Sequence, residues 1–366
     1  MLRKALLLSA APLLATAISL SAQAQEKVVN VYNWSDYIDD SILTDFTKET
    51  GIKVVYDVYD SNEILETKLL AGGSGYDVVV PTASPFLARQ IEAGVYQKLD
   101  KSKLPNIVNM WDIVAERVAK YDSGNEYSVN YMWGTTGIGY NTKKVSDALG
   151  VETIDSWDVF FNPDKLSKLA DCGVYVLDSP SDILPTTLRY LGFDPESTSP
   201  DDLAKAEEVL MKIRPYIRKF HSSEYINALA NGDICLAVGF SGDIFQARDR
   251  AAEADQGVDI AYAIPKEGAE MWFDQMAIPA DAPHADEALA FINYMMKPEV
   301  AAKAANYVFY ASGNKAAQQF IDKEIIDDPA IYPDEATMKN LFTVSPYDPK
   351  TQRVITRTWT KIITGQ

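Results

Sequence analysis

A regular alternation of short apolar strands and amphipathic helices, beginning at Val28, constrains the fold of this chain more than any other feature. Continuous apolar strands alternating with helices indicate a doubly wound α/β lobe with a buried, parallel sheet. The alternation runs through a strand at 28–34, a helix at 41–50 ended by Gly51, a strand at 52–58, a helix at 61–71 ended by Gly72-Gly73, and a strand at 76–80 closed by Pro81.

The first strand stops abruptly at Trp34, Ser35, Asp36 and Tyr37. Ligands in open α/β sheets bind beyond the carboxyl ends of strands, so this tetrad is a candidate pocket. Aromatic faces attract organic cations and a carboxylate pairs with an ammonium, which favours an aliphatic amine over a sugar or a phosphate. The alternative is a turn whose Trp34 and Tyr37 pack into the core.

A second group of candidate residues, Thr82, Ser84 and Phe86, follows the strand at 76–80. If the strands are parallel, these side chains lie on the same rim as Trp34 and Asp36. Thr82 or Ser84 could instead cap the following helix.

The segment 131–141, YMWGTTGIGYN, is expected to leave the first lobe as a hinge strand. Its glycines run in the reverse of the dinucleotide-binding order, and the sequence has no Gly-Lys-Ser/Thr element, so nucleotide binding is excluded. A second α/β set follows, and its strand at 234–240 ends in Phe240-Ser241-Gly242-Asp243. Ser241 or Asp243 could cap a helix there, with or without a ligand role.

The strand expected at 271–279, after a return crossing at 258–265, places Trp272, Asp274 and Met276 on one face. A buried carboxylate needs a partner, so Asp274 beside Trp272 favours a ligand contact over a core position.

Residues 1–24 have the three parts of a secretory signal: basic Arg3 and Lys4, an apolar run, and Ala22-Gln23-Ala24 as a cleavage site. No cysteine follows the apolar run at the cleavage point, and no later segment approaches the length of a membrane span. We therefore expect an exported, periplasmic protein without a lipid anchor or membrane insertion.

Loss of the signal changes the formal charge from −18 to −20 and leaves 342 of the 366 residues. Such an acidic chain repels nucleic acid and anionic membranes and favours cations at long range, although acidity also serves solubility alone. The length exceeds what one core usually holds, which predicts two lobes.

Cys172 and Cys235 are the only cysteines, and an even number in an exported chain predicts one disulfide. Two buried free thiols are the alternative. A metal site is not expected, because neither cysteine has a ligating residue at suitable spacing.

Eight stretches together resemble the periplasmic polyamine-binding proteins of bacterial ABC importers, the putrescine and spermidine receptors. They are VYNWSDYI, TGIKVVYDVYDSNE, GYDVVVPTAS, YQKLDKSKLPN, WGTTGIGYN, FHSSEYINALANGDIC, IPKEG and TRTWTKI. The resemblance implies an α/β, two-lobed periplasmic-binding fold of type II, with two crossings and a ligand cleft between the lobes. We expect lobe 1 to comprise 25–134 plus 258–310 and lobe 2 to comprise 135–257 plus 311–366.

The resemblance also implies ligand-binding roles for thirteen residues. The aromatic box is expected from Trp34, Tyr37, Phe240, Trp272 and Tyr310, the ammonium-binding acids from Asp36, Asp182, Asp243 and Asp274, and further lining from Ser35, Thr82, Ser84 and Phe86. Phe240 stands where related sequences often have Trp, and Asp182 where Glu is found. Because spermidine-accepting relatives tend to carry Trp at position 272, we expect spermidine to bind at least as well as putrescine.

The implied partners are a polyamine, an inner-membrane ABC permease and its ATPase, with a monomeric receptor and no cofactor. An exported enzyme acting on amines or peptides is the main alternative. His221 and His284 are the only histidines, and neither has the context of a nucleophilic triad, so no catalytic residue is expected. A polyamine-sensing receptor subunit would use the same cleft.

Overall fold

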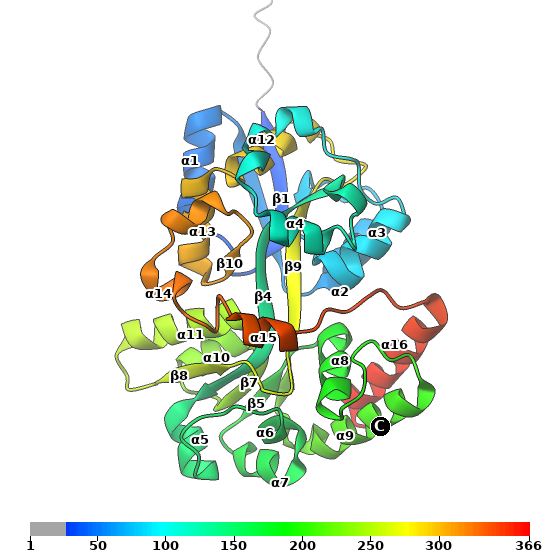
Figure 1. Cartoon of the computed structure of the whole chain (residues 1–366), viewed down its shortest axis with the longest axis vertical. Coiled ribbons are helices and arrows are strands. Elements are labelled where there is room, and N and C mark those ends of the chain that lie inside the picture. Colours follow the sequence, from blue (N-terminus) through cyan, green and yellow to red (C-terminus); the bar gives the residue numbers. More distant parts are fainter. Residues whose placement is uncertain (1–26) are drawn as a thin grey trace, which may run out of the picture.

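The computed structural model describes residues 27–366 and has the predicted two-lobed α/β architecture (Figure 1). One mixed sheet runs through both lobes in the order β2-β1-β3-β9-β4-β7-β5-β6, and β8 and β10 also pair with β4. The strands are β1 Val28–Trp34, β2 Lys53–Tyr59, β3 Val78–Val79, β4 Ser128–Asn141, β5 Val174–Val176, β6 Lys219–Phe220, β7 Leu236–Phe240, β8 Ile260–Ala263, β9 Glu270–Ala277 and β10 Ala311–Ser312.

Helices cover both faces of the sheet in each lobe (Figure 1). None of the helices within residues 27–366 combines the length and apolar character that a membrane span requires. The helices are α1 Asp40–Thr50, α2 Asn62–Leu70, α3 Ala88–Glu92, α4 Asp112–Val118, α5 Thr142–Leu149, α6 Asp158–Phe161, α7 Pro163–Leu166, α8 Pro180–Tyr190, α9 Pro200–Ile213, α10 Tyr225–Ala230, α11 Ser241–Ala254, α12 Ala285–Met295, α13 Pro298–Val308, α14 Lys323–Ile326, α15 Glu335–Asn340 and α16 Pro349–Thr364.

In lobe 1, β1 lies between β2 and β3 and is parallel to both, as the strand pattern predicts. The turn from β1 to α1 is short, because the Asp39 carboxylate accepts a hydrogen bond from the Ser41 amide and caps α1. Gly51 ends α1 with a φ of 71°, a left-handed conformation that glycine adopts without strain. These local signals bring the end of β1 to the edge that faces lobe 2.

The long strand β4 joins the two lobes, and all of its fourteen residues are buried. Its first half pairs with β9 in lobe 1, and its second half pairs with β7 and β8 in lobe 2. Figure 1 shows β4 and β9 running side by side between the upper and lower lobes. The strand expected at 131–141 is therefore part of a longer strand that belongs to both lobes.

Two segments pack against a different lobe from the one expected. Strand β8 pairs with the second half of β4, and its Ile260 and Ala263 lie in the lobe 2 core. Strand β10 pairs with Met132 and Trp133, and the segment up to Ile331 packs in the lobe 1 core. We therefore propose that β8 belongs to lobe 2 and that residues 311–332 belong to lobe 1.

We propose that the chain crosses between the lobes three times, where the resemblance implies two. The third crossing follows α14, passes α15 between the lobes and leads to α16 on lobe 2 (Figure 1). Ile355, Trp359 and Ile362 of α16 are buried in the lobe 2 core. The C-terminal helix therefore packs on lobe 2, whereas α12 and α13 pack on lobe 1.

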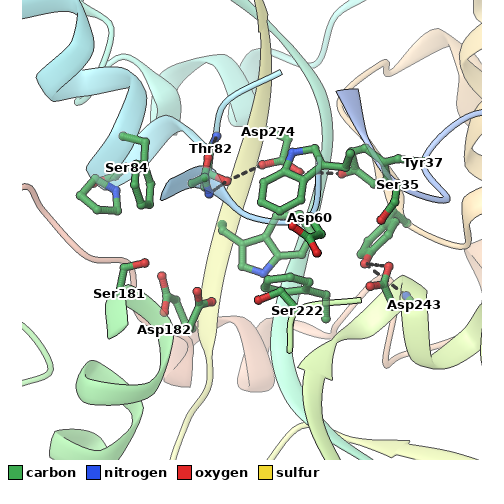
Figure 2. A pocket seen from close by; sticks show the side chains of 18 residues that line it. Ser35, Tyr37, Asp60, Thr82, Ser84, Ser181, Asp182, Ser222, Asp243 and Asp274 are labelled. Carbon is green, nitrogen blue, oxygen red and sulfur yellow. Dashed lines mark hydrogen bonds between the residues drawn. The ribbon is translucent and has the colours of Figure 1, made fainter. Parts of the chain in front are cut away.

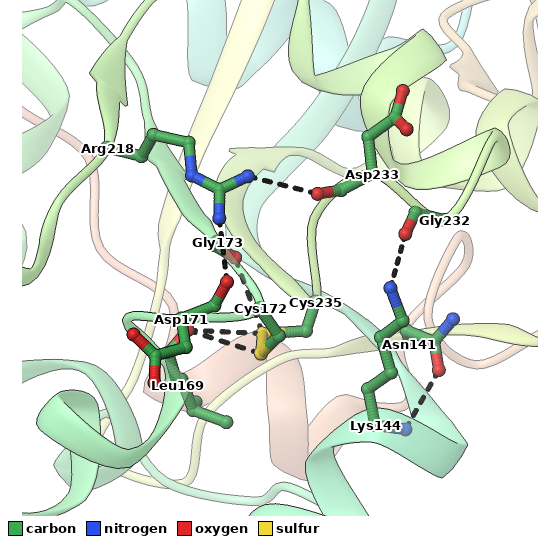
Figure 3. The surroundings of a disulfide bond; sticks show 10 residues. All are labelled: Asn141, Lys144, Leu169, Asp171, Cys172, Gly173, Arg218, Gly232, Asp233 and Cys235. Carbon is green, nitrogen blue, oxygen red and sulfur yellow. Dashed lines mark hydrogen bonds between the residues drawn. A yellow bond between two sulfur atoms is a disulfide. The ribbon is translucent and has the colours of Figure 1, made fainter.

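The predicted disulfide between Cys172 and Cys235 is present in lobe 2, with the two Cα atoms 5.6 Å apart (Figure 3). It links the segments that lead into β5 and β7, which are neighbouring parallel strands. The Arg218 guanidinium donates to the Asp171 and Asp233 carbonyls on either side of the bridge. In the chain-entropy view, closing a loop of 63 residues stabilises the fold by about 4 kcal/mol.

Candidate ligand-binding site

A cleft lies between the two lobes, and Figure 2 shows the side chains that line it. The structure brings together twelve of the thirteen residues expected to bind ligand. They are Trp34, Ser35, Tyr37, Thr82, Ser84, Phe86, Asp182, Phe240, Asp243, Trp272, Asp274 and Tyr310.

Asp36 is the exception, because its carboxylate does not line the cleft. The residue has a φ of 54°, a left-handed conformation that turns the chain sharply after β1. Its carboxylate Oδ1 instead accepts a hydrogen bond from the guanidinium of Arg250 on α11, at 2.6 Å. In this structure the Asp36 carboxylate therefore forms an ion pair with Arg250 of α11 and does not face the cleft.

Asp274 of β9 lies at the lobe 1 side of the cleft and is 3% exposed. Its carboxylate accepts hydrogen bonds from the Tyr37 hydroxyl at 2.8 Å and the Thr82 hydroxyl at 2.7 Å. Burial raises the pKa of Asp274 to about 7, although both hydrogen bonds act in the opposite direction. The group is therefore poised to lose a proton when a cation arrives.

Asp243 occupies the first turn of α11 on lobe 2, directly after β7. The Tyr225 and Tyr310 hydroxyls donate to its carboxylate at 2.6 and 2.7 Å. Burial raises the pKa of Asp243 to about 6, and the two tyrosines oppose that shift. Phe240 precedes α11 without a side-chain capping bond, so the helix-cap reading of this cluster is not observed.

Asp182 lies in the first turn of α8, at the other end of the cleft from Asp243 (Figure 2). Its carboxylate accepts hydrogen bonds from the Ser179 hydroxyl at 2.5 Å and the Thr136 hydroxyl at 2.8 Å. Burial raises the pKa of Asp182, as it does for the other two acids.

The aromatic residues form a continuous wall of edge-on contacts. Phe240 lies 6.1 Å from Trp34 and 5.5 Å from Trp272 between ring centroids, and Tyr310 lies 5.4 Å from Trp272 and 5.2 Å from Tyr37. Two glycines leave room for this wall. A Cβ at Gly134 would meet the Trp272 ring at 2.8 Å, and one at Gly242 would meet the Tyr310 ring at 2.4 Å.

Three of the remaining predicted residues have partners of their own. The Ser84 hydroxyl donates to the Val344 carbonyl at 2.5 Å, which joins the cleft to the third crossing. The Arg89 guanidinium covers the Phe86 ring at 4.3 Å from the centroid. The Thr82 side chain makes no helix-capping bond and is oriented toward Asp274 instead.

Six residues that line the cleft were not predicted: Asp60, Asn62, Pro85, Ser181, Ser222 and Glu270. Two of them could have been found from the sequence. Asp60 directly follows the carboxyl end of β2, where the same argument as for Trp34 applies. Glu270 lies two residues before Trp272, so the period-two pattern extends to it.

The charged side chains of residues 27–366 that line the cleft are all acidic. Its described lining contains five acids, Asp60, Asp182, Asp243, Glu270 and Asp274, and no lysine, arginine or histidine. Buried carboxylates without cationic partners are costly. The arrangement therefore favours a ligand that brings positive charge at more than one point and an apolar stem between.

Comparison with known proteins agrees with this geometry. Residues 41–333 match the family model described as bacterial extracellular solute-binding protein. The chain is 56% identical to the putrescine-binding periplasmic protein SpuD of Pseudomonas aeruginosa over 96% of both chains, and 51% identical to the putrescine-binding periplasmic protein PotF of Escherichia coli over 98% of this chain and 97% of that protein. A solved structure described as a putative spermidine/putrescine ABC transporter from Listeria monocytogenes superposes with a TM-score of 0.83 at 33% identity, covering 93% of this chain and all of that one.

Proposed function

The chain belongs to the family of bacterial extracellular solute-binding proteins, and we propose that it captures a polyamine in the cleft between its lobes and delivers it to an ABC importer. Spermidine and putrescine are the proposed ligands. The relatives with this high identity are binding proteins for putrescine, which supports a binding role rather than an enzymatic one.

One observation carries the proposal: buried carboxyl groups face an aromatic-lined cleft whose described lining contains no basic residue. An ammonium satisfies a buried carboxylate, and the rings of Trp34, Phe240 and Trp272 can cover the methylene stem and attract the charge. We propose that Asp243 and Asp274 bind the same ammonium. The Tyr310 hydroxyl donates to Asp243 and the Tyr37 hydroxyl donates to Asp274. The Tyr37 and Tyr310 rings pack against each other, so the two acids are linked through neighbouring tyrosines.

The remaining partners follow from this proposal. A periplasmic receptor of this family would present its closed, liganded form to an inner-membrane permease driven by an ATPase. Export would use the expected signal at 1–24, which lies outside the described residues. We propose that the receptor acts as a monomer.

Titration calorimetry of the mature chain with putrescine, cadaverine, agmatine, spermidine and spermine tests the binding proposal. We expect saturable binding of at least putrescine or spermidine at one site. A folded protein that binds none of the five amines would contradict the proposal.

The same samples test the enzyme alternative. After prolonged incubation, each amine should be recovered unchanged by chromatography. If the wild type converts any amine into a product and Asp274→Asn does not, the cleft is catalytic instead.

A further inference from the structure

Glu270 is a buried carboxyl group in the cleft that the recognition of a diamine does not use. It is 4% exposed, lines the cleft, and its Oε2 has no hydrogen-bond partner within the described part of the chain. Burial raises the pKa of Glu270 well above its usual range, and the charge of Asp182 adds to that shift. An unpartnered buried carboxyl destabilises a fold, so its presence points to a ligand.

The position of Glu270 follows from its strand. In β9, Glu270, Trp272 and Asp274 share one face, and all three line the cleft. At a rise of about 3.3 Å per residue, the Cα atoms of Glu270 and Asp274 are about 13 Å apart along β9, which runs from lobe 2 to lobe 1. Trp272 lies between them.

Strand pairing places Glu270 at the Asp182 end. Glu270 lies opposite Thr136 of β4, and the Thr136 hydroxyl donates to the Asp182 carboxylate. The charge of Asp182 also raises the pKa of Glu270. Glu270 thus lies toward Asp182, away from Asp243, and the described lining supplies no cation to either carboxyl group.

Polyamines differ in the distance between their terminal nitrogens. With bonds of about 1.5 Å, an extended putrescine spans about 6 Å between its nitrogens, whereas spermidine spans about 11 Å. Asp182 lies at the other end of the cleft from Asp243, so a triamine held by Asp243 and Asp274 reaches farther toward Asp182 and Glu270 than a diamine does.

We propose that Glu270, together with Asp182, binds the second terminal ammonium of a long polyamine and makes the cleft selective for spermidine over putrescine. This inference rests on the proposed function and adds a specificity-determining residue to it. Putrescine gains little from Glu270, because its second ammonium stops short of the carboxyl pair.

Competition calorimetry of spermidine, putrescine and 1,8-diaminooctane on the wild type and Glu270→Gln tests the proposal. The octane diamine has the length of spermidine without its central nitrogen. We expect Glu270→Gln to weaken spermidine and the octane diamine at least about tenfold and putrescine less than about threefold. Glu116→Gln, on the exposed side of α4, is the matched control and should change none of the three.

Melting temperature of the ligand-free variants separates binding from folding. Glu270→Gln and Glu270→Met remove an unpartnered buried carboxyl and should melt at or above the wild-type temperature. An unchanged spermidine-to-putrescine ratio in both variants would overturn the inference. Absence of all polyamine binding by the wild type would instead contradict the proposed function itself.

Discussion

The two ends of the cleft hold their acids in different ways. At one end, Asp243 and Asp274 each accept hydrogen bonds from two hydroxyl groups, and three of these four hydroxyls belong to tyrosines. At the other end, Asp182 is held by Ser179 and Thr136, while Glu270 Oε2 has no partner in the described structure. One end is therefore pre-organised for an ammonium, and the other gains its last partner only when a long ligand arrives.

The largest effect should come from neutralising the pre-organised end. Asp274→Asn and Asp243→Asn should each weaken every polyamine by about two to three orders of magnitude, because a desolvated ammonium loses its carboxylate. The ligand-free variants should melt no lower than the wild type, since an amide can still accept from the tyrosine. Asp201→Asn, on the exposed start of α9, is the control. Near-wild-type affinity in both variants would contradict the assignment.

Lowering the pH should weaken binding by protonating the same two acids. With pKa values of about 7 for Asp274 and about 6 for Asp243, two protons must leave before an ammonium binds at pH 5.5. The expected loss between pH 8 and pH 5.5 is on the order of 100-fold. Calorimetry in buffers of different ionisation enthalpy should detect the released protons. A flat affinity across this range would mean that the acids are already charged in the free protein.

The stability of the ligand-free protein should follow the opposite trend. Both acids have native pKa values above their unfolded values, so the native state binds more protons between about pH 4 and pH 7. Their contribution to the free energy of unfolding is most favourable at low pH and is lost as the pH rises through the native pKa values. In Asp243→Asn plus Asp274→Asn, denaturant titrations should show a smaller decline over that range.

Removing one hydroxyl donor from each end of the cleft should weaken binding less than neutralising an acid does. The loss of affinity for putrescine and for spermidine should differ between the two ends. Tyr37→Phe deletes a donor to Asp274 and should weaken putrescine and spermidine alike, by about tenfold. Ser179→Ala deletes a donor to Asp182 and should weaken spermidine more than putrescine. Equal losses for both ligands in Ser179→Ala would remove the distinction between the two ends.

The smallest effect is expected at Asp36, outside both ends. Its ion pair with Arg250 is partly exposed, with side chains 39% and 31% accessible, and exposed pairs contribute about 0 to 1 kcal/mol. Asp36→Asn should therefore weaken all polyamines by less than about fivefold and should act through closure of the lobes. A loss as large as that of Asp274→Asn would restore Asp36 as a ligand of the ammonium.

Local signals in the sequence predicted the α/β lobes and part of the cleft, the cysteine count predicted the disulfide, and Asp182 and Tyr310 were expected only from the family resemblance. Apolar alternation identified the strands, and the residues after strands β1, β3 and β7 lie at the cleft, as parallel strand ends require. The same period-two rule located Trp272 and Asp274, and one further step back along β9 reaches Glu270.

Tertiary structure alone decided which of these polar groups are partnered. The left-handed backbone at Asp36 directs its carboxylate to Arg250, which is 214 positions away in the chain. Tyr225 and Tyr310 reach Asp243 from separate segments, and β8 pairs with the half of β4 that also pairs with β7. Hydrogen bonds and desolvation depend on contacts between residues far apart in sequence, so a local pattern can place a carboxylate in the cleft but cannot determine what satisfies it.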